Sequence, residues 1–327
     1  MSNSDSKYQR RYFWPPLGNN KVADFLDSSL SSGRLAQTYI FVGADGLGKS
    51  TLAQAFAENL LLADGQKKLS GVNSDLYILE RPEDKKEIPI DAVRDFIKML
   101  SLSSFLGSYK IGIIKEAEKL NLNSANALLK TLEEPRDKVV IILLATSLMS
   151  LPETLVSRAQ TLYFSPVPYD IIYDYLLSEK KVDRANAKNL AALSAGRPLE
   201  AIRLLEEPVY YEEQLNSVRL FLSFFSQSMV DRVSALKKLG SLSREEAENL
   251  IFSWQRVWRD LLLLHLAQPE LLQYAALHEE LQLVNLQLAN QDLSYYYQLA
   301  ESLTRAQKYL AANVSPATVL EQVIFNL

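Results

Sequence analysis

The sequence predicts an α/β domain built on a mostly parallel sheet, followed by two all-helical parts. Up to residue 166, short apolar segments rich in β-branched residues alternate with segments of helical spacing, and several apolar segments carry no polar residue on either face. This pattern is typical of a parallel sheet covered by helices on both sides. After Ser165-Pro166-Val167-Pro168 only helical spacing continues, and the proline pair favours a hinge. We therefore expect an α/β domain over residues 1–166 and helical domains over 167–207 and 208–327.

The expected strands and helices follow from apolar periodicity, taken in chain order. The run Thr38–Val42 is β-branched and aromatic and leads into a glycine-rich loop, which indicates a buried strand. The complete expectation is an amphipathic helix at Lys21–Leu30, strands at Thr38–Val42, Asp75–Leu79, Tyr109–Ile114, Val139–Ala145 and Thr161–Phe164, helices at Ser50–Ala63, Asp91–Leu100 and Ser124–Glu134, and a loop at Asp64–Asn73.

Composition excludes several kinds of site. The chain of 327 residues has no cysteine, so disulfides and thiolate metal sites are excluded. Its two histidines, His265 and His278, belong to no carboxylate cluster, so no zinc site is expected. The net charge of −4 argues against a large DNA-binding surface on this chain alone, so any DNA contact is expected to be local or shared with partners. No apolar run has the length of a signal peptide or a membrane span, which predicts a cytoplasmic protein without membrane contact.

The strongest motif is Gly43-Ala44-Asp45-Gly46-Leu47-Gly48-Lys49-Ser50, which matches the P-loop pattern GxxxxGK[ST]. Its glycines let backbone N–H groups surround phosphates, Lys49 neutralises the β- and γ-phosphates, and the Ser50 hydroxyl is suited to ligate Mg²⁺. A strand precedes the motif and a helix follows it, as the mechanism requires. The motif predicts a site for ATP with Mg²⁺. The alternative is a P-loop fold that no longer binds nucleotide.

A second nucleotide element is expected at the end of an apolar strand, where an acidic residue holds Mg²⁺ and polarises water. The candidate strand Ile111–Ile114 is followed by Lys115 and Glu116. A lysine at this position opposes cation binding, while Glu116 could still act as a base or be a solvated surface charge. We therefore expect hydrolysis at this chain's own site to be impaired or absent.

A third stretch, LNSANALLKTLEEP at residues 122–135, identifies the family. Together with the P-loop and Leu155-Val156-Ser157-Arg158-Ala159-Gln160, it resembles the AAA+ clamp-loader subunits of bacterial DNA polymerase III, and most of all their delta prime branch. The resemblance is dense from Arg34 to Phe164 and thinner through the helical C-terminal third. It implies a P-loop AAA+ nucleotide-binding domain over 1–166, a helical lid over 167–207 and a helical collar for oligomerisation over 208–327.

The resemblance also implies roles for single residues. Thr146 matches the sensor of the γ-phosphate, and Arg197 is a looser match to a second sensor in the lid. Ser157 and Arg158 match a Ser-Arg-Cys motif with Ala159 in place of cysteine, and the family offers that arginine in trans to a neighbour's ATP site. Read without the family, Arg158 is a surface or helix-capping arginine. The residues implied in nucleotide binding are Gly43, Gly46, Gly48, Lys49, Ser50, Thr51, Thr146 and Arg197, with Ser50 on Mg²⁺, and those implied in catalysis are Arg158 in trans and Glu116, impaired by Lys115.

The function implied by the resemblance is that of a subunit at one end of a pentameric clamp loader in DNA replication. The expected partners are gamma/tau motor subunits, a clamp-opening delta subunit, the sliding clamp, and primer–template DNA reached through the complex. Many relatives carry a four-cysteine zinc module after the P-loop helix, but Leu62–Ser74 holds no cysteine, so zinc is not implied. The alternatives are an ATP-hydrolysing gamma/tau-type motor subunit and a nucleotide-independent scaffold.

Overall fold

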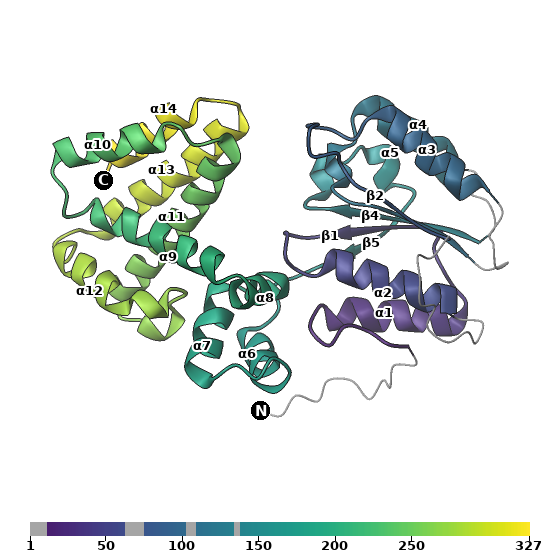
Figure 1. The fold of residues 1–327 in the computed structure, drawn as a ribbon, viewed down its shortest axis with the longest axis horizontal. Helices are drawn as coiled ribbons and strands as arrows, with labels where there is room; N and C mark the ends of the chain where they lie inside the picture. The colour runs from purple at the N-terminus through teal and green to yellow at the C-terminus, as the bar shows by residue number, and fades with distance from the viewer. Residues whose placement is uncertain (1–11, 63–74, 103–108, 134–137) are drawn as a thin grey trace. The chain divides into compact units, whose positions relative to one another are not determined.

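The computed structural model describes residues 12–62, 75–102, 109–133 and 138–327 (Figure 1). The chain divides into two compact units. The described residues of the first fall within Met1–Ile172 and Gly196–Leu199, and the second is formed by Tyr173–Ala195 and Glu200–Leu327. The expected lid segment, 167–207, contributes to both units, and the three-domain division remains a prediction.

The first unit is built on a five-stranded parallel sheet. Its strands are β1 (Thr38–Val42), β2 (Leu76–Leu79), β3 (Lys110–Ile114), β4 (Val139–Ala145) and β5 (Gln160–Tyr163), in the order β2-β3-β4-β1-β5. All residues of β1, β3 and β4 are buried, whereas the edge strands β2 and β5 are partly exposed. The predicted parallel sheet is confirmed.

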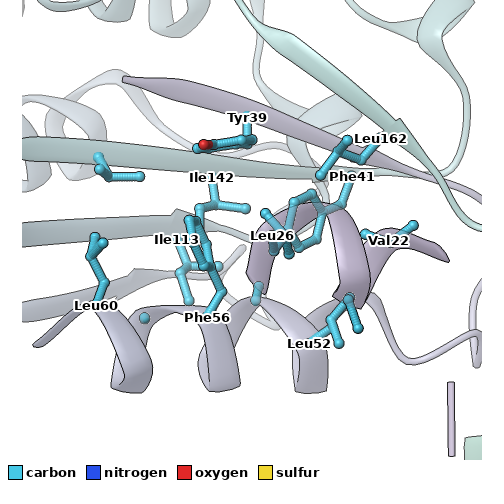
Figure 2. Close-up of a cluster of buried hydrophobic side chains, with 14 of the residues drawn as sticks. Val22, Leu26, Tyr39, Phe41, Leu52, Phe56, Leu60, Ile113, Ile142 and Leu162 are labelled. Atoms are coloured by element: carbon cyan, nitrogen blue, oxygen red, sulfur yellow. The ribbon is translucent and has the colours of Figure 1, made fainter. Parts of the chain in front are cut away.

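Helices cover both faces of this sheet (Figure 1). Side chains of a strand alternate between faces, so Tyr39 and Phe41 of β1 pack on one side, against α1 (Asn20–Ser32) and α2 (Lys49–Leu62). Figure 2 shows this cluster, where Phe56 of α2 meets the edge of the Tyr39 ring at a centroid distance of 5.3 Å. The alternate β1 residues pack on the other side with α3 (Ile90–Ser101), α4 (Leu122–Glu133) and α5 (Glu153–Val156).

The observed element bounds lie close to the expected ones. The strand at Thr38–Val42 and the strand at Val139–Ala145 have the expected limits, and the first helix extends from Asn20 to Ser32, where Gly33 ends it in a left-handed conformation with φ of 66°. The expected loop at Asp64–Asn73 lies outside the described residues, as do Glu134, Pro135 and all but the first residue of Leu62–Ser74.

From Tyr169 onward the described chain contains helices and no strand, as expected. A cluster of aromatic side chains forms much of the second unit's core: Trp254 and Trp258 lie on one long helix and stack or pack edge-on with Phe221 and Tyr296. The helices are α6 (Tyr169–Ser178), α7 (Arg184–Leu193), α8 (Pro198–Glu206), α9 (Pro208–Ser223), α10 (Met229–Leu239), α11 (Arg244–His265), α12 (His278–Gln287), α13 (Leu293–Ala311) and α14 (Pro316–Phe325), with short 3-10 turns at Pro269–Leu271 and Ala275–Leu277.

Among the helices in the described part of the chain, none combines the length and the apolar character needed to cross a membrane.

Candidate functional site

A pocket of about 160 Å³ lies within the first unit, at the edge where the parallel strands end. Open α/β sheets bind ligands at this edge, outside the carboxyl ends of their strands. Gly43, Thr51 and Arg197 were predicted to bind nucleotide but do not line the pocket. Its lining consists of Asp45, Gly46, Gly48, Lys49, Ser50, Lys115, Glu116, Glu118, Leu144, Ala145, Thr146 and Leu199.

The P-loop has the backbone geometry of an anion cradle. Gly46 and Gly48 have φ values of 81° and 85°, a left-handed conformation that side-chain-bearing residues rarely adopt. A Cβ atom at Gly48 would meet nothing within 4 Å, so the backbone there faces open space. Helix α2 begins directly after it, at Lys49, and its N-terminal N–H groups favour an anion. These features fit a phosphate group.

Lys49 lies against its own loop. Its side chain is 8% exposed, and Nζ donates to the carbonyl oxygens of Gly43 and Ala44 and pairs with Asp45 Oδ1 at 3.3 Å. To bind a triphosphate, the ammonium group must exchange some of these partners for phosphate oxygens. The pocket is also smaller than the roughly 300–1,000 Å³ usual for ligand sites.

The two residues that follow β3 form ion pairs with residues that follow the neighbouring strand β2. Lys115 Nζ lies 2.5 Å from Glu80 Oε1, and Glu116 Oε2 accepts from Arg81 Nε at 2.8 Å. Glu80 and Arg81 follow β2, which neighbours β3 in the sheet. Glu116 itself has a left-handed backbone with φ of 48°. Partly exposed pairs of this kind contribute little stability, but they hold both side chains on the β2 side of the pocket.

Glu118 is a pocket residue to which the sequence analysis gave no role. It lies in the 3-10 turn Ala117–Lys119, and its Oε1 accepts a hydrogen bond from Thr146 Oγ1 at 2.8 Å. Its Oε2 is buried and has no hydrogen-bond partner among the described residues. The only sequence signal was a second acidic residue shortly after Glu116, and the turn that returns it to the strand edge is not evident from spacing alone.

Both predicted sensors lie near the P-loop. Thr146 follows β4, lines the pocket and holds Glu118. Arg197 is half-buried and packs on the P-loop, because a Cβ atom at Gly46 would lie 3.2 Å from the Arg197 Cβ. The Leu199 N–H donates to the Gly46 carbonyl at 3.1 Å, which fixes this segment on the loop.

Arg158 lies at the opposite edge of the sheet from the P-loop. Strands β5 and β1 are parallel, with Gln160 opposite Tyr39 and Tyr163 opposite Val42. Arg158 precedes β5 and so lies where β1 begins, whereas the P-loop follows the end of β1. At about 3.3 Å per residue, β1 separates these edges by about 17 Å. The structure therefore does not bring Arg158 to this chain's own pocket.

The Arg158 guanidinium is held but remains accessible. Its Nη2 pairs with Glu133 Oε1 at 2.8 Å, and its Nη1 donates to the Thr154 carbonyl at 3.0 Å and to Ser157 Oγ at 3.3 Å. The side chain is 36% exposed. The side chain is thus held by contacts within its own unit while about a third of its surface remains exposed.

Comparisons with known proteins agree with this organisation. Residues 18–168 match the family described as DNA polymerase III, delta subunit. The chain is 32% identical over 212 residues to DNA polymerase III subunit delta' of Haemophilus influenzae, covering 59% of this chain and 64% of that protein. It is 34% identical over 183 residues to the subunit of the same name from Pseudomonas aeruginosa, covering 52% and 56%.

Over residues 18–168 the chain is similar to the DNA polymerase III clamp-loader family, and the two relatives at 32% and 34% identity are delta' subunits. The matched segments span less than two thirds of either delta' relative. A solved DNA polymerase III gamma subunit-related protein from Thermotoga maritima has the same fold, with a TM-score of 0.51 at 19% identity, covering 92% of this chain and 97% of that one. The first unit thus has the P-loop AAA+ fold, as predicted.

Proposed function

We propose that this chain is a delta prime-type subunit of the DNA polymerase III clamp loader, which supplies Arg158 in trans to the ATP site of a neighbouring subunit. The observation that carries the proposal is the placement of Arg158 and the P-loop at opposite edges of one parallel sheet. A guanidinium that cannot reach its own pocket, yet is 36% exposed, is arranged for use by another molecule.

The chemistry of such a group is electrostatic. As the γ-phosphoryl group of the neighbour's ATP is transferred to water, negative charge spreads over its oxygens, and a guanidinium stabilises that charge. Arg158 is always protonated and carries its charge on a planar fork of donors. Its bonds to Glu133 and Thr154 restrict the side chain before a neighbour arrives, which lowers the ordering cost of the contact.

The chain's own pocket is proposed to bind ATP weakly and to hydrolyse it negligibly. Gly46, Gly48, Lys49 and Ser50 are the residues that would hold the phosphates and Mg²⁺. Bound Mg²⁺ would neutralise charge on the β- and γ-phosphates. The Glu116 carboxylate, however, is paired with Arg81, and the adjacent Lys115 is paired with Glu80. The group expected to orient the attacking water is therefore held by Arg81.

The partners are proposed from the family. Motor subunits of the gamma/tau type would receive Arg158, and a delta-type subunit, the sliding clamp and primer–template DNA would be engaged through the assembled complex. The net charge of −4 supports shared rather than independent DNA binding. The helical unit is proposed as the collar that holds the subunits together.

Reconstitution with motor and delta-type subunits tests the proposal. Complexes carrying Arg158→Ala should assemble normally and lose ATP turnover at the site that receives the arginine, together with clamp loading on primed DNA. Arg94→Ala is the matched control, because it removes an exposed arginine whose ion pair among the described residues is with the neighbouring Asp91 on α3. Unchanged loading by the Arg158→Ala complex would instead identify a scaffold, and turnover by the isolated chain close to that of a motor subunit would refute the weak-hydrolysis part.

A further inference from the structure

The Glu118 carboxylate is an unusual group in the P-loop pocket. One oxygen is held by the Thr146 hydroxyl at 2.8 Å, while the other is buried without a hydrogen-bond partner among the described residues. Buried polar atoms nearly always have partners, and a carboxylate oxygen that lacks one within the protein calls for a proton donor, a water or an ion. This oxygen belongs to a residue that lines the pocket.

The other charges around the pocket compensate one another. Asp45 pairs with Lys49, Lys115 with Glu80, and Glu116 with Arg81. Among the charged side chains that line the pocket, Glu118 is the one whose contact within the described residues is a hydrogen bond to a neutral hydroxyl. The charge left without an ionic counterpart is therefore negative, and it lies in the same pocket as the Ser50 hydroxyl. A carboxylate and a hydroxyl are oxygen ligands of the kind that Mg²⁺ takes.

We propose that Glu118, held by Thr146, is the carboxylate that meets the divalent cation of a nucleoside triphosphate in this pocket, directly or through a cation-bound water. This role falls to Glu118 because Lys115 and Glu116, the residues after β3, are paired with Glu80 and Arg81. Thr146 is then a positioning residue, since its hydroxyl fixes one carboxylate oxygen and leaves the other for the cation. The inference rests on the proposed function only for the admission of a triphosphate, and it is independent of Arg158.

The test measures the affinity of the full chain for ATP carrying a fluorescent ribose label, with MgCl₂ and with EDTA. In the unsubstituted protein, Mg²⁺ should tighten binding. Glu118→Gln keeps the side-chain size and an oxygen that can accept from Thr146, and it should reduce the Mg²⁺-dependent gain by about tenfold or more, in the range seen when groups of a metal site are removed. Binding in EDTA should be equal or tighter, because a negative charge near the phosphates is lost.

Glu58→Gln is the matched control, because it makes the same charge change at an exposed position on α2 that does not line the pocket. A second variant, Thr146→Val, removes only the hydroxyl that holds Glu118 and should reduce the Mg²⁺-dependent gain by a smaller factor. It decides the question if Glu118→Gln fails to fold. Mn²⁺ in place of Mg²⁺, followed by electron paramagnetic resonance, reports directly on the cation.

An equal Mg²⁺-dependent gain in Glu118→Gln and the unsubstituted protein would overturn the inference. So would a complete absence of Mg²⁺-dependent binding in the unsubstituted protein at millimolar ATP. Either result leaves the role of Arg158 intact, because that role is read from a neighbour's turnover. Failure of the Arg158→Ala experiment, conversely, does not alter the Mg²⁺ dependence of this pocket.

Discussion

Each of the two compact units contains an acidic residue with at least one buried oxygen, and the two residues differ in how fully their oxygens are hydrogen-bonded. In the α/β unit, Glu118 has one buried oxygen without a hydrogen-bond partner among the described residues and lies on a pocket. In the helical unit, Asp260 is 0% exposed and satisfied: its Oδ2 accepts from the Gln273 and Tyr274 N–H groups at 2.9 and 2.8 Å, and its Oδ1 accepts from Arg259.

This difference distinguishes a carboxylate that stabilises the fold from one that we propose for ligand binding. Asp260 ties the chain that follows α11 back onto that helix, so all of its hydrogen-bonding capacity serves the fold. Glu118 uses one oxygen on Thr146, and in our proposal the other oxygen serves a ligand. The same division extends to the surroundings, since the α/β unit places polar side chains on its strand edges while the helical unit buries an aromatic cluster around Trp254 and Trp258.

The largest expected effect tests whether Arg158 contributes to ATP turnover without contributing to the stability of the fold. Arg158→Ala should lower turnover at the receiving ATP site of the reconstituted complex by about 10³-fold or more, the usual contribution of an arginine finger. Its thermal unfolding should stay near that of the unsubstituted chain, because the side chain is partly exposed. Single-turnover ATP hydrolysis by the complex measures the first quantity. A loss of folding without a specific loss of turnover would break the comparison.

The next effect tests whether a core residue of the helical unit contributes to stability without contributing to nucleotide binding. Trp254 is 0% exposed and packs against Phe221 and Phe224. Trp254→Ala should lower the free energy of unfolding by about 3–5 kcal/mol, since it removes a large buried ring and leaves a cavity. Urea unfolding followed by circular dichroism measures this change. Nucleotide affinity of the α/β unit should be unaffected below the transition, and a change in affinity comparable to that of a pocket variant would contradict the separation.

Asp260 predicts a pH-dependent stability. Burial raises the pKa of its carboxyl above the ordinary value of 3.8, although the Tyr274 N–H and Arg259 act to lower it. A raised pKa means that the folded state binds the proton more tightly, so this group's contribution to stability is greatest below the ordinary pKa and is lost as pH rises through the raised value. Asp260→Asn removes this contribution. The free energy of unfolding of the variant, relative to the unsubstituted chain, should therefore increase between about pH 4 and pH 7.

Urea titrations of both proteins at the two pH values measure this difference, and the other titrating groups cancel when the two proteins are subtracted. A relative stability that stays constant with pH would show that the Asp260 carboxyl has the same proton affinity folded and unfolded. A relative stability that declines would reverse the sign of the effect.

The smallest effect concerns the partner of Arg158. The Arg158–Glu133 pair is 36% and 49% exposed, and pairs of this kind contribute about 0–1 kcal/mol. Glu133→Gln should lower turnover at the receiving site by no more than about fivefold, without changing the affinity of that site for ATP, because only the orientation of Arg158 is loosened. The ratio of kcat to KM effects in the complex separates these quantities. A rise in turnover would instead show that Glu133 competes with phosphate for the guanidinium.

The sheet was predictable because its signals are local. Strands such as Val139–Ala145 are apolar on both faces, and each side chain of that strand is buried in the structure. The same locality explains why the P-loop and its flanking strand and helix were located from the sequence. Their geometry follows from a few adjacent residues, above all the glycines with left-handed backbones.

The site was less predictable because its charged residues come from different strands and meet only through the order of those strands in the sheet. The sequence indicated that Lys115 opposes a cation, but its pairing with Glu80 arises only because β2 lies beside β3. The pocket position of Glu118 likewise depends on a 3-10 turn after β3 and on Thr146 at the end of another strand. No spacing rule along the chain links these residues.

Arg158 and the P-loop lie at opposite ends of β1, so under the proposed function the molecule has a side that donates an arginine and a side that accepts one. Subunits that join donor to acceptor form a row with a direction, which closes into a ring or continues without limit when each member does both. A member that gives a guanidinium but makes poor use of one terminates the row. The difference between the two sides of this chain would then determine its position at the end of an assembly.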